Sequence, residues 1–408
     1  MEQLIKKYAD KLVKAGLGHE SGKFQPIVGG LDDTLVWNRH AEEIPVLEKI
    51  FNTLNINSLV FLRPAPPHAD TITYLAAEAL KSDGIIHPAD CETRTFLHDL
   101  PVVDRFDAAI ITETLKKRKS VIVMQEPPGS YPAVIAHGSV SPEQGFVTIS
   151  SVCFACFVKF FSDYLHHLRS GYDIRKQHDL YDRILYPVKS EYEILPEFIP
   201  GPFRDSETVY SAMIEAGAKT VEYSLVDSYF GNVSCLWENT IYISQTGASL
   251  DELAGCIDPV PMDGSTSAGI TASSELTAHM KIVSQTEYTT ILHGHPRFSV
   301  IMSMDCAPDK RSVCRFKDQC HIKCPEKRAI CNIPIVPGEV GTGPFGLCTT
   351  LPPAFEKSCT AIVYGHGVFA AGRHDFSDAF TGIMNTETMC QSIYIEKINV
   401  LRKKAQVI

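Results

Sequence analysis

The sequence predicts an α/β fold arranged as two domains, and three observations lead to this prediction. Short apolar runs rich in β-branched residues alternate with amphipathic stretches of helical periodicity along most of the chain. The same order of elements occurs twice. The chain also has 408 residues, more than one hydrophobic core usually serves, with the 44% hydrophobic and 21% charged residues of an ordinary globular protein.

The first half of the chain, residues 1–190, is expected to be one α/β domain. It begins with an amphipathic helix over residues 1–16, a pattern that differs from a signal peptide. The further elements expected here are strands at 59–62, near 100–103, at 121–125 and at 133–135, and helices at about 69–82 and 142–168. No apolar run approaches the length of a membrane span, since the longest, residues 152–158, ends at Lys159.

A stretch rich in proline and glycine, residues 191–206, is expected to link the first domain to a second one over residues 207–408. The elements expected in the second domain are helices at 207–216 and from about 375 onward, and strands at 240–243, 289–292 and 361–364. Their order resembles that of the first half, with residues 61–63 matching 291–293 and residues 136–138 matching 365–367. The sequence therefore indicates a tandem of related domains, and a coincidence of two similar α/β segments is the alternative.

The composition excludes some classes of partner. A formal net charge of −10, from 48 acidic and 38 basic residues, argues against nucleic acid or an anionic membrane as the main partner. Thirteen cysteines without a secretory signal are typical of the reducing cytoplasm, where thiols are free or bind a metal. A cytoplasmic protein that binds a small molecule is the class that remains.

Two histidines separated by one glycine, His293 and His295, are the first candidate metal ligands. The flanking residues 288–292 and 298–302 predict a strand, on which both side chains would point to the same side. Neutral imidazole is a common zinc ligand, and a catalytic zinc site needs three protein ligands and one open position. His366 is the natural third ligand, because it lies between two glycines at the end of a predicted strand. Taken alone, each of the three is more often a surface or loop histidine than a metal ligand.

A helix expected over residues 271–285 adds further chemistry. Ser273 or Ser274 is expected to cap its amino end, where free backbone amides form a site for an anion. Glu275, in the first turn, is interpreted in two ways. It is either a glutamate that stabilises the helix dipole or a general acid/base near the metal.

Taken in order, these motifs and two glycine turns before them resemble the class II aldolase/adducin superfamily, in particular the fuculose-phosphate and rhamnulose-phosphate aldolases. The family pattern is Gly-Asn-x-Ser, Thr-Gly, Ser-Ser-Glu, His-x-His and a distant His. The residues that carry it here are Gly231, Asn232, Ser234, Thr246, Gly247, Ser273, Ser274, Glu275, His293, His295 and His366. The resemblance covers residues 207–408 and is limited in the first half to the order of elements.

The resemblance implies a three-layer α/β/α domain in which His293, His295 and His366 hold a divalent cation, Zn²⁺ being the first choice. It implies that Glu275 is the catalytic acid/base. Six residues would hold a substrate phosphate: Gly231, Asn232, Thr246, Gly247, Ser273 and Ser274. The implied activity is that of an aldehyde-lyase, which cleaves or forms a carbon–carbon bond in a phosphorylated sugar or related hydroxy-ketone through a metal-stabilised enediolate.

Two alternative functions stay open on the same fold. A sugar-phosphate 4-epimerase or a decarboxylase would use similar metal chemistry. A non-catalytic, adducin-like binding protein would keep the fold without the chemistry, although such a protein has no use for three histidines and Glu275 in this pattern.

Further expectations concern the assembly and the first domain. Family members are typically rings, so the resemblance implies a homo-oligomer, either a dimer of tandem domains or a larger assembly. If the two halves are copies, the first has Arg63 and Ala65 where the second has its histidines. The first domain would then be a degenerate copy without metal chemistry.

The chain departs from the family pattern in two places. Tyr229 and Phe230 precede Gly231 where the family has a small residue, which changes the shape of the expected phosphate pocket. The spacer between His295 and His366 is long and rich in cysteine. Four of these cysteines are interpreted either as ligands of a second, structural zinc ion or as reduced thiols: Cys314, Cys320, Cys324 and Cys331.

Overall fold

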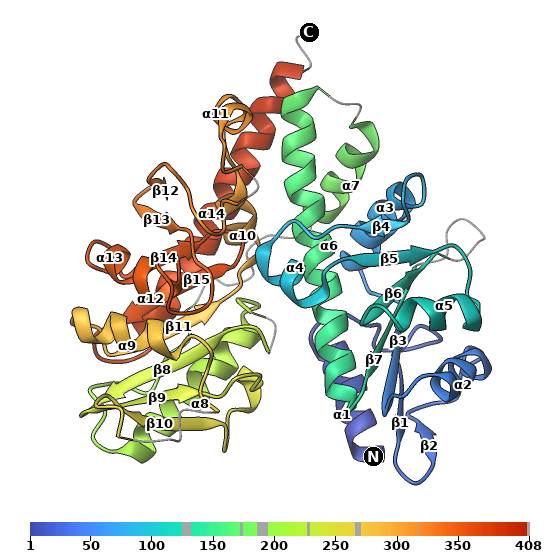
Figure 1. Ribbon diagram of the computed structural model, residues 1–408, viewed down its shortest axis with the longest axis horizontal. Helices are drawn as coiled ribbons and strands as arrows, with labels where there is room; N and C mark the ends of the chain where they lie inside the picture. Colours follow the sequence, from blue (N-terminus) through green and yellow to red (C-terminus); the bar gives the residue numbers. More distant parts are fainter. Residues whose placement is uncertain are drawn as a thin grey trace. The chain divides into compact units, whose positions relative to one another are not determined.

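The computed structural model describes residues 1–124, 132–171, 174–185, 195–226, 229–265, 271–317 and 319–405. Its contacts divide the chain into two compact units, Met1–Lys189 and Ser190–Ile408, here called unit 1 and unit 2. Each unit has one mixed sheet with helices packed against it (Figure 1), so the predicted α/β class is confirmed. Of the linker expected at 191–206, residues 191–194 lie outside the described ranges.

Unit 1 has a seven-stranded sheet in the order β2-β1-β3-β7-β6-β5-β4. Neighbouring strands are antiparallel except β5 and β6, which are parallel. The strands are β1 (Ile27–Leu31), β2 (Leu35–Trp37), β3 (Ser58–Leu62), β4 (Ile85–Ile86), β5 (Leu100–Val103), β6 (Ser120–Val123) and β7 (Ala133–Gly138). Apolar residues of β3, β6 and β7 form a core with α2 and α5.

The helices of unit 1 are α1 (Glu2–Lys14), α2 (Ile44–Thr53), α3 (His68–Ala79), α4 (Cys91–Leu97), α5 (Ala108–Leu115), α6 (Pro142–Ser170) and α7 (Arg175–Leu185). By length and composition α6 could cross a membrane, but 83% of its most apolar window is buried inside the protein. It is the core helix of unit 1. Its apolar sequence is not continuous, because Lys159 interrupts it. Lys159 pairs with Asp163 one turn later at 2.9 Å.

Unit 2 has an eight-stranded sheet in the order β10-β9-β8-β11-β15-β14-β13-β12, antiparallel throughout except for β13 and β14. The strands are β8 (Asn232–Trp237), β9 (Thr240–Ser244), β10 (Ile257–Pro261), β11 (Thr290–Gly294), β12 (Arg328–Ile330), β13 (Ile333–Val336), β14 (Thr360–Val363) and β15 (Gly367–Gly372). The helices are α8 (Ser206–Glu222), the 3₁₀ turn η1 (Leu250–Glu252), α9 (Leu276–Gln285), α10 (Arg297–Met304), α11 (Pro308–Val313), α12 (Leu347–Thr350), α13 (Pro352–Phe355) and α14 (Ser377–Ala405).

Helices cover both faces of the unit 2 sheet, which gives the expected three layers. On one face α9, α12 and α13 pack on apolar side chains of the central strands, among them Ile291, Val363 and Phe369. On the other face α14 comes close to the sheet, because Gly382 has no side chain to collide with Thr360 and Ala370. Since β15 is antiparallel to β11 and β14, the carboxyl ends of β11 and β14 meet the amino end of β15 at one edge.

Residues 298–302, expected to form a strand, belong to α10 instead. A short continuous apolar run is compatible with a strand or with a buried helix, and here Pro296 ends the extended segment at the N-cap position. Glu387 of α14 then accepts hydrogen bonds from the backbone N–H groups of Phe298 and Ser299, both at 2.8 Å. These orphan donors of the first helical turn are thereby satisfied by a side chain from a neighbouring helix.

The expected serine cap of the preceding helix, α9, is also wrong. α9 begins at Leu276, so Glu275 occupies the N-cap position, and Ser273 and Ser274 lie before the helix. The Ser273 hydroxyl does accept a hydrogen bond from the backbone N–H of Glu275 (3.3 Å). The serine therefore shapes the turn that leads into the helix rather than the helix itself.

The expected match between His137 and His366 is wrong as well. His366 directly precedes the first residue of β15, whereas His137 is the next-to-last residue of β7 and lies at the opposite end of its strand. The match fails because connections of different length join the corresponding strands in the two units.

Candidate metal centre

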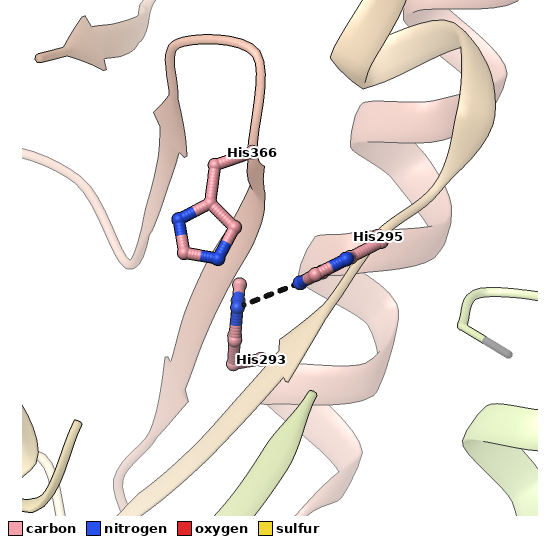
Figure 2. A group of neighbouring side chains, drawn as sticks. All are labelled: His293, His295 and His366. Atoms are coloured by element: carbon pink, nitrogen blue, oxygen red, sulfur yellow. Dashed lines mark hydrogen bonds between the residues drawn. The ribbon is translucent and has the colours of Figure 1, made fainter. Parts of the chain in front are cut away.

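Three histidines come together at the edge where β11, β14 and β15 meet (Figure 2). His293 lies in β11, His295 in the turn between β11 and α10, and His366 in the turn between β14 and β15. One nitrogen atom from each ring lies within 4.8 Å of the others, and all three residues are buried. In the described ranges, this is the one group of three or more His, Cys, Asp or Glu side chains that has such spacing.

The orientation of His293 leaves one nitrogen available as a ligand. Its Nδ1–H donates a hydrogen bond to the backbone carbonyl of Val368 (3.0 Å), so its Nε2 carries the lone pair. That Nε2 lies 3.0 Å from the Nε2 of His295, as the dashed line in Figure 2 shows. A carbonyl partner on the far nitrogen is typical of histidines that bind metals.

The backbone around the rings is close-packed. A Cβ atom at Gly367 would lie 2.7 Å from His295 Cδ2 and 2.8 Å from His293 Cε1, so only glycine fits there. Gly231 has a φ of 137°, and a Cβ there would lie 2.5 Å from the carbonyl oxygen of His293. Phe369 stacks on the His293 ring with 3.9 Å between ring centroids. The rings are therefore held in place by sheet backbone and core side chains.

Burial keeps the three imidazoles neutral at physiological pH. It lowers the pKa of His293 and of His366 to about 4, and it lowers the pKa of His295 well below the ordinary 6.5. Neutral rings with converging lone pairs are what a metal ion requires. The residues present thus fit a divalent cation that favours nitrogen ligands, which is the preference of zinc.

Glu275 lies beside the histidines. Its Oε2 is 3.6 Å from His293 Nε2 and its Oε1 is 3.7 Å from His366 Nε2. Asn232 Nδ2 donates a hydrogen bond to Glu275 Oε2 at 2.6 Å. Burial raises the pKa of Glu275, whereas His366 and the Asn232 amide act in the opposite direction. A carboxylate in this position can exchange a proton with a molecule bound next to the histidines.

Sequence reasoning missed His279, which lies one turn after Glu275 in α9 and is completely buried. Its Nδ1 is 2.7 Å from the Ser234 hydroxyl, and its ring meets Phe369 edge-on. Burial lowers the pKa of His279 to about 3. A histidine four residues after a candidate catalytic glutamate lies on the same helix face, and this spacing is the signal that was available.

The residues expected to hold a phosphate lie in adjoining loops. The backbone N–H of Ser273 donates to the Ser244 carbonyl (3.0 Å), and that of Thr246 donates to the Thr271 carbonyl (2.9 Å). The turn with Thr246 and Gly247 therefore lies beside the segment with Ser273 and Ser274. β8, which begins with Asn232 after Gly231, pairs with β9 next to them.

The six residues expected to hold a phosphate differ in their exposure to solvent. Thr246, Gly247 and Ser274 are exposed, whereas Asn232 and Ser273 are buried. Residues 227–228 and 266–270, which flank the loops in sequence, lie outside the described ranges. Phe230, the departure noted in the sequence, places its ring 6.0 Å from that of His295. Phosphate binding at these residues stays a prediction.

In the described part of the chain, no three of the four cysteines considered for a second zinc converge as ligands of one ion. Cys314, Cys320, Cys324 and Cys331 instead line a cavity of about 790 Å³ that Tyr364 also borders. All thirteen cysteines of the chain are free thiols in the structure. The geometry thus favours reduced thiols, and a second metal site has no support from it.

The sequence of unit 2 matches a protein-family model. That family is the Class II Aldolase and Adducin N-terminal domain, and the match covers residues 211–394. Unit 2 contains a class II aldolase domain. The resemblance drawn from the motifs is thereby confirmed for this part of the chain. The class II aldolase domain includes Glu275 and the three candidate ligands, and unit 1 lies outside the matched residues.

Several solved structures are similar to parts of this chain. An L-fuculose-1-phosphate aldolase from Thermus thermophilus is 17% identical, with 47% of this chain and 95% of that one covered and a TM-score of 0.37. YgbL from Klebsiella pneumoniae, a putative aldolase/epimerase/decarboxylase, is 19% identical, with 47% and 91% covered and a TM-score of 0.38. An N-terminal class II aldolase domain from Thermoplasma acidophilum is 12% identical, with 50% and 99% covered and a TM-score of 0.33.

These likenesses to solved structures carry no inference about activity, because the identities and TM-scores are low. No curated protein shows significant sequence similarity to this chain. The class II aldolase domain is therefore assigned from the family match, and its chemistry has to be argued from its own residues.

Proposed function

We propose that unit 2 is a divalent-metal-dependent lyase of the aldolase type, acting on a phosphorylated sugar or a related hydroxy-ketone. The observation that carries the proposal is the convergence of His293, His295 and His366 with Glu275. A buried carboxylate lies 3.6 and 3.7 Å from two imidazole nitrogens that are themselves placed as ligands. The candidate metal ligands and the candidate proton-transfer group therefore lie next to one another.

The three histidines would hold the cation, with zinc as the expected metal. When bound, a divalent cation there would act as a Lewis acid on carbonyl and hydroxyl oxygens of the substrate. The chain contributes a fixed direction for the His293 ring, through the Val368 carbonyl and the stacked Phe369. It also excludes water, because the ligands are buried.

Glu275 would transfer the proton at the carbon next to the substrate carbonyl. Burial raises its pKa, and a nearby cation would lower it, so the two effects oppose each other at this carboxyl group. The Asn232 amide fixes one carboxylate oxygen at 2.6 Å and leaves the other oriented toward His366. Positioning by Asn232 keeps the carboxylate facing the ligands.

A substrate phosphate would bind at the adjoining loops that contain Gly231, Asn232, Thr246, Gly247, Ser273 and Ser274. At the surface, Gly247 has a backbone N–H and Ser274 has a hydroxyl, whereas the hydroxyl and N–H of Thr246 donate to the Ala272 and Thr271 carbonyls. The buried Asn232 connects the group to Glu275. A phosphate held there would place the neighbouring carbonyl of the same molecule toward the histidines. The chain would act as a homo-oligomer in the cytoplasm, a setting that suits thirteen free thiols.

The first test is metal content. We expect the purified protein to bind about one equivalent of divalent metal per chain, since one three-ligand site suffices for one ion, and we expect His293→Ala to lose it. His40→Ala, an exposed histidine of unit 1, is the matched control and should keep it. Elemental analysis after dialysis measures both variants, and an unchanged metal content in His293→Ala would refute the ligand assignment.

The second test is turnover. Candidate ketose phosphates are supplied and released aldehyde is trapped, while epimer formation and CO₂ release are measured in parallel. Aldehyde release supports the aldolase, and an epimer or CO₂ as the only product would replace it by one of the alternative activities on this fold. Metal binding without any turnover would favour a binding protein.

The role of Glu275 has its own test. We expect Glu275→Gln to keep the metal and to lose turnover by on the order of 10²- to 10⁴-fold, the usual contribution of a general acid/base. The amide preserves the shape of the side chain and removes its titration. Full activity in Glu275→Gln would remove this residue from the mechanism.

A further inference from the structure

The sheets of the two units have the same topology. The order β2-β1-β3-β7-β6-β5-β4 in unit 1 corresponds strand by strand to β9-β8-β11-β15-β14-β13-β12 in unit 2, with β10 added at the edge. Each corresponding pair of neighbours runs in the same sense, including the parallel pairs β5–β6 and β13–β14. The helices after β7 and β15, α6 and α14, both have 29 residues.

The registers of the strands also agree. In the hairpins β6–β7 and β14–β15, the last residue of the first strand pairs with the first residue of the second. In the pairs β3–β7 and β11–β15, the last residue of β3 or β11 pairs with the second residue of its partner. Between the parallel strands, third residue pairs with third residue in both units. Positions in the two sheets can therefore be equated residue by residue.

One stretch matches without any gap. α2 and α9 each have 10 residues, and each is followed by a connection of equal length and a five-residue strand, β3 or β11. A glutamate occupies the N-cap position of both helices, Glu43 in unit 1 and Glu275 in unit 2. Both glutamates are buried. At the far end of the stretch, Pro64 stands in unit 1 where Pro296 stands in unit 2.

We propose that unit 1 is a second copy of the class II aldolase domain in which an ion pair between Glu43 and Arg63 has replaced the metal site. By register, Phe61 stands where His293 does, Arg63 where His295 does, and Pro132 where His366 does. The glutamate is kept and all three candidate ligands are gone.

Around the site, polar residues of unit 2 are likewise matched by apolar residues in unit 1. Ile27 pairs with Phe61 where Asn232 pairs with His293, so the amide that holds Glu275 has no counterpart. Leu47 stands in α2 where His279 stands in α9. The equivalent positions of unit 1 are thus apolar, apart from the Glu43 carboxylate and the Arg63 guanidinium.

The ion pair fills the place of a bound cation. An Arg63 guanidinium nitrogen lies 3.4 Å from Glu43 Oε1, and the two side chains are only 12% and 9% exposed. The guanidinium carbon lies 5.4 Å from the ring centroid of Phe61 and 5.6 Å from that of Phe24. A permanent positive charge supplied by the chain therefore sits beside the retained carboxylate.

Electrostatics explains why the glutamate and the arginine occur together. A carboxylate removed from water is strongly disfavoured unless a positive charge or several donors compensate it. In unit 2 a metal on the three histidines would provide that charge within reach of Glu275. In unit 1 Arg63 provides it without a metal, so unit 1 is folded independently of metal and contributes no second catalytic centre. The unit 2 side of this comparison rests on the proposed function, whereas the pair in unit 1 does not.

A double-mutant cycle on the full chain tests the ion pair. Urea unfolding is measured for Arg63→Met, Glu43→Gln and the double variant. We expect Arg63→Met to shift the midpoint of the unit 1 transition to lower urea and Glu43→Gln to recover most of that shift. Glu113 and Lys116, an exposed ion pair of unit 1 at 2.6 Å, provide the control cycle, in which Glu113→Gln and Lys116→Met should show little coupling.

Each outcome of this cycle shows whether Arg63 compensates the buried charge of Glu43. If Arg63→Met gives no folded protein but the double variant folds, the pair is supported as strongly as by a shifted midpoint. If the two single effects simply add, or if the double variant is no better than Arg63→Met, the pair does not compensate a buried charge and the proposal is refuted.

The equivalence with unit 2 is tested by moving the arginine. His295→Arg and His295→Met both remove a ligand, and their unfolding is compared without metal. We expect His295→Arg to unfold at higher urea than His295→Met, and we expect the difference to vanish when Glu275→Gln is added. If His295→Arg unfolds at the same urea concentration as His295→Met, the equivalence of the two positions is refuted. A wild-type protein without metal would contradict the proposed function alone and leave the Glu43–Arg63 coupling intact.

Discussion

Gly367 is the position where a single added carbon acts directly on the candidate ligands. Its missing side chain allows β15 to pass between the rings of His293 and His295 and the carbonyl of Gly294. Those neighbours are backbone and buried rings, which have little freedom to move. The glycine therefore belongs to the metal centre although it offers no ligand atom.

We expect Gly367→Ala to weaken zinc binding by roughly tenfold or more, the usual effect of disturbing residues that orient ligands. Competition with a zinc indicator measures the affinity. Gly343→Ala is the matched control, because a Cβ there meets nothing within 4 Å. Equal affinities in Gly367→Ala and wild type would show that the rings can relax around the added methyl group.

His279 gives a prediction about pH. Its pKa is about 3 in the folded protein because of burial, against an ordinary 6.5 in the unfolded chain. Unfolding therefore takes up a proton below pH 6.5, and the free energy of unfolding falls as the pH is lowered toward 3. The loss attributable to this one residue approaches about 1.4 kcal/mol per pH unit between the two pKa values.

His279→Leu isolates this effect, since unit 1 has Leu47 at the equivalent position. In metal-free protein, the stability of wild type relative to His279→Leu should fall progressively from pH 6.5 to pH 4. Urea unfolding at several pH values measures it. A constant difference across this range would contradict burial of a neutral imidazole, and His40→Leu, at an exposed histidine, is the reference for nonspecific effects.

At the scale of elements, the joint between β11 and α10 depends on a distant helix. Glu387 of α14 accepts hydrogen bonds from the backbone N–H groups of Phe298 and Ser299 and from the Ser299 hydroxyl, each at 2.8 Å. Its side chain is partly buried, and this burial raises its pKa. The turn that carries His295 ends directly at this helix start, so Glu387 fixes where that ligand lies.

We expect Glu387→Ala to lower the free energy of unfolding by roughly 2–5 kcal/mol, since three donors lose their acceptor in a buried place. Metal affinity should fall as well, because the α10 start that follows His295 is released. Glu387→Gln, which keeps one acceptor oxygen, should lose less. Glu396→Ala, an exposed glutamate of the same helix, is the control and should be close to neutral. Denaturant unfolding and zinc titration give both quantities.

Helices and strands with a clear local pattern of apolar residues could be predicted from the sequence. Elements whose ends depend on tertiary contacts could not. Residues 59–62 and 142–168 were found within a few positions, because β-branched runs and a long apolar helix are local signals. Residues 298–302 were misassigned, since the cap from Glu387 that favours a helix comes from the far end of the chain. The start of α9 was misplaced for a similar reason, because Ser273 is drawn toward β9 by its backbone bond to Ser244.

At the scale of the whole chain, the site in unit 2 was predictable and its counterpart in unit 1 was not. Spaced motifs with fixed residue types indicate His293, His295 and His366, and the fold brings these residues together. The duplicated order of elements was visible too, but the residue match within it was wrong, because turns of different length displace the two halves. Only strand registers equate Phe61 and Arg63 with the histidine positions. A lost site has no motif left to recognise.

The Glu43–Arg63 pair also limits the order in which mutations can have removed a metal site. Leaving a buried carboxylate without its cation costs about 3–5 kcal/mol. That is a large share of the roughly 5–15 kcal/mol that keeps a domain folded. If unit 1 is a second copy, as proposed, a form that lost its last metal ligand before gaining the arginine would have been barely folded, so the arginine would have arrived no later than that loss. Replacing Arg63 alone would again leave the buried Glu43 carboxylate without a cation, so the change is hard to reverse by single mutations.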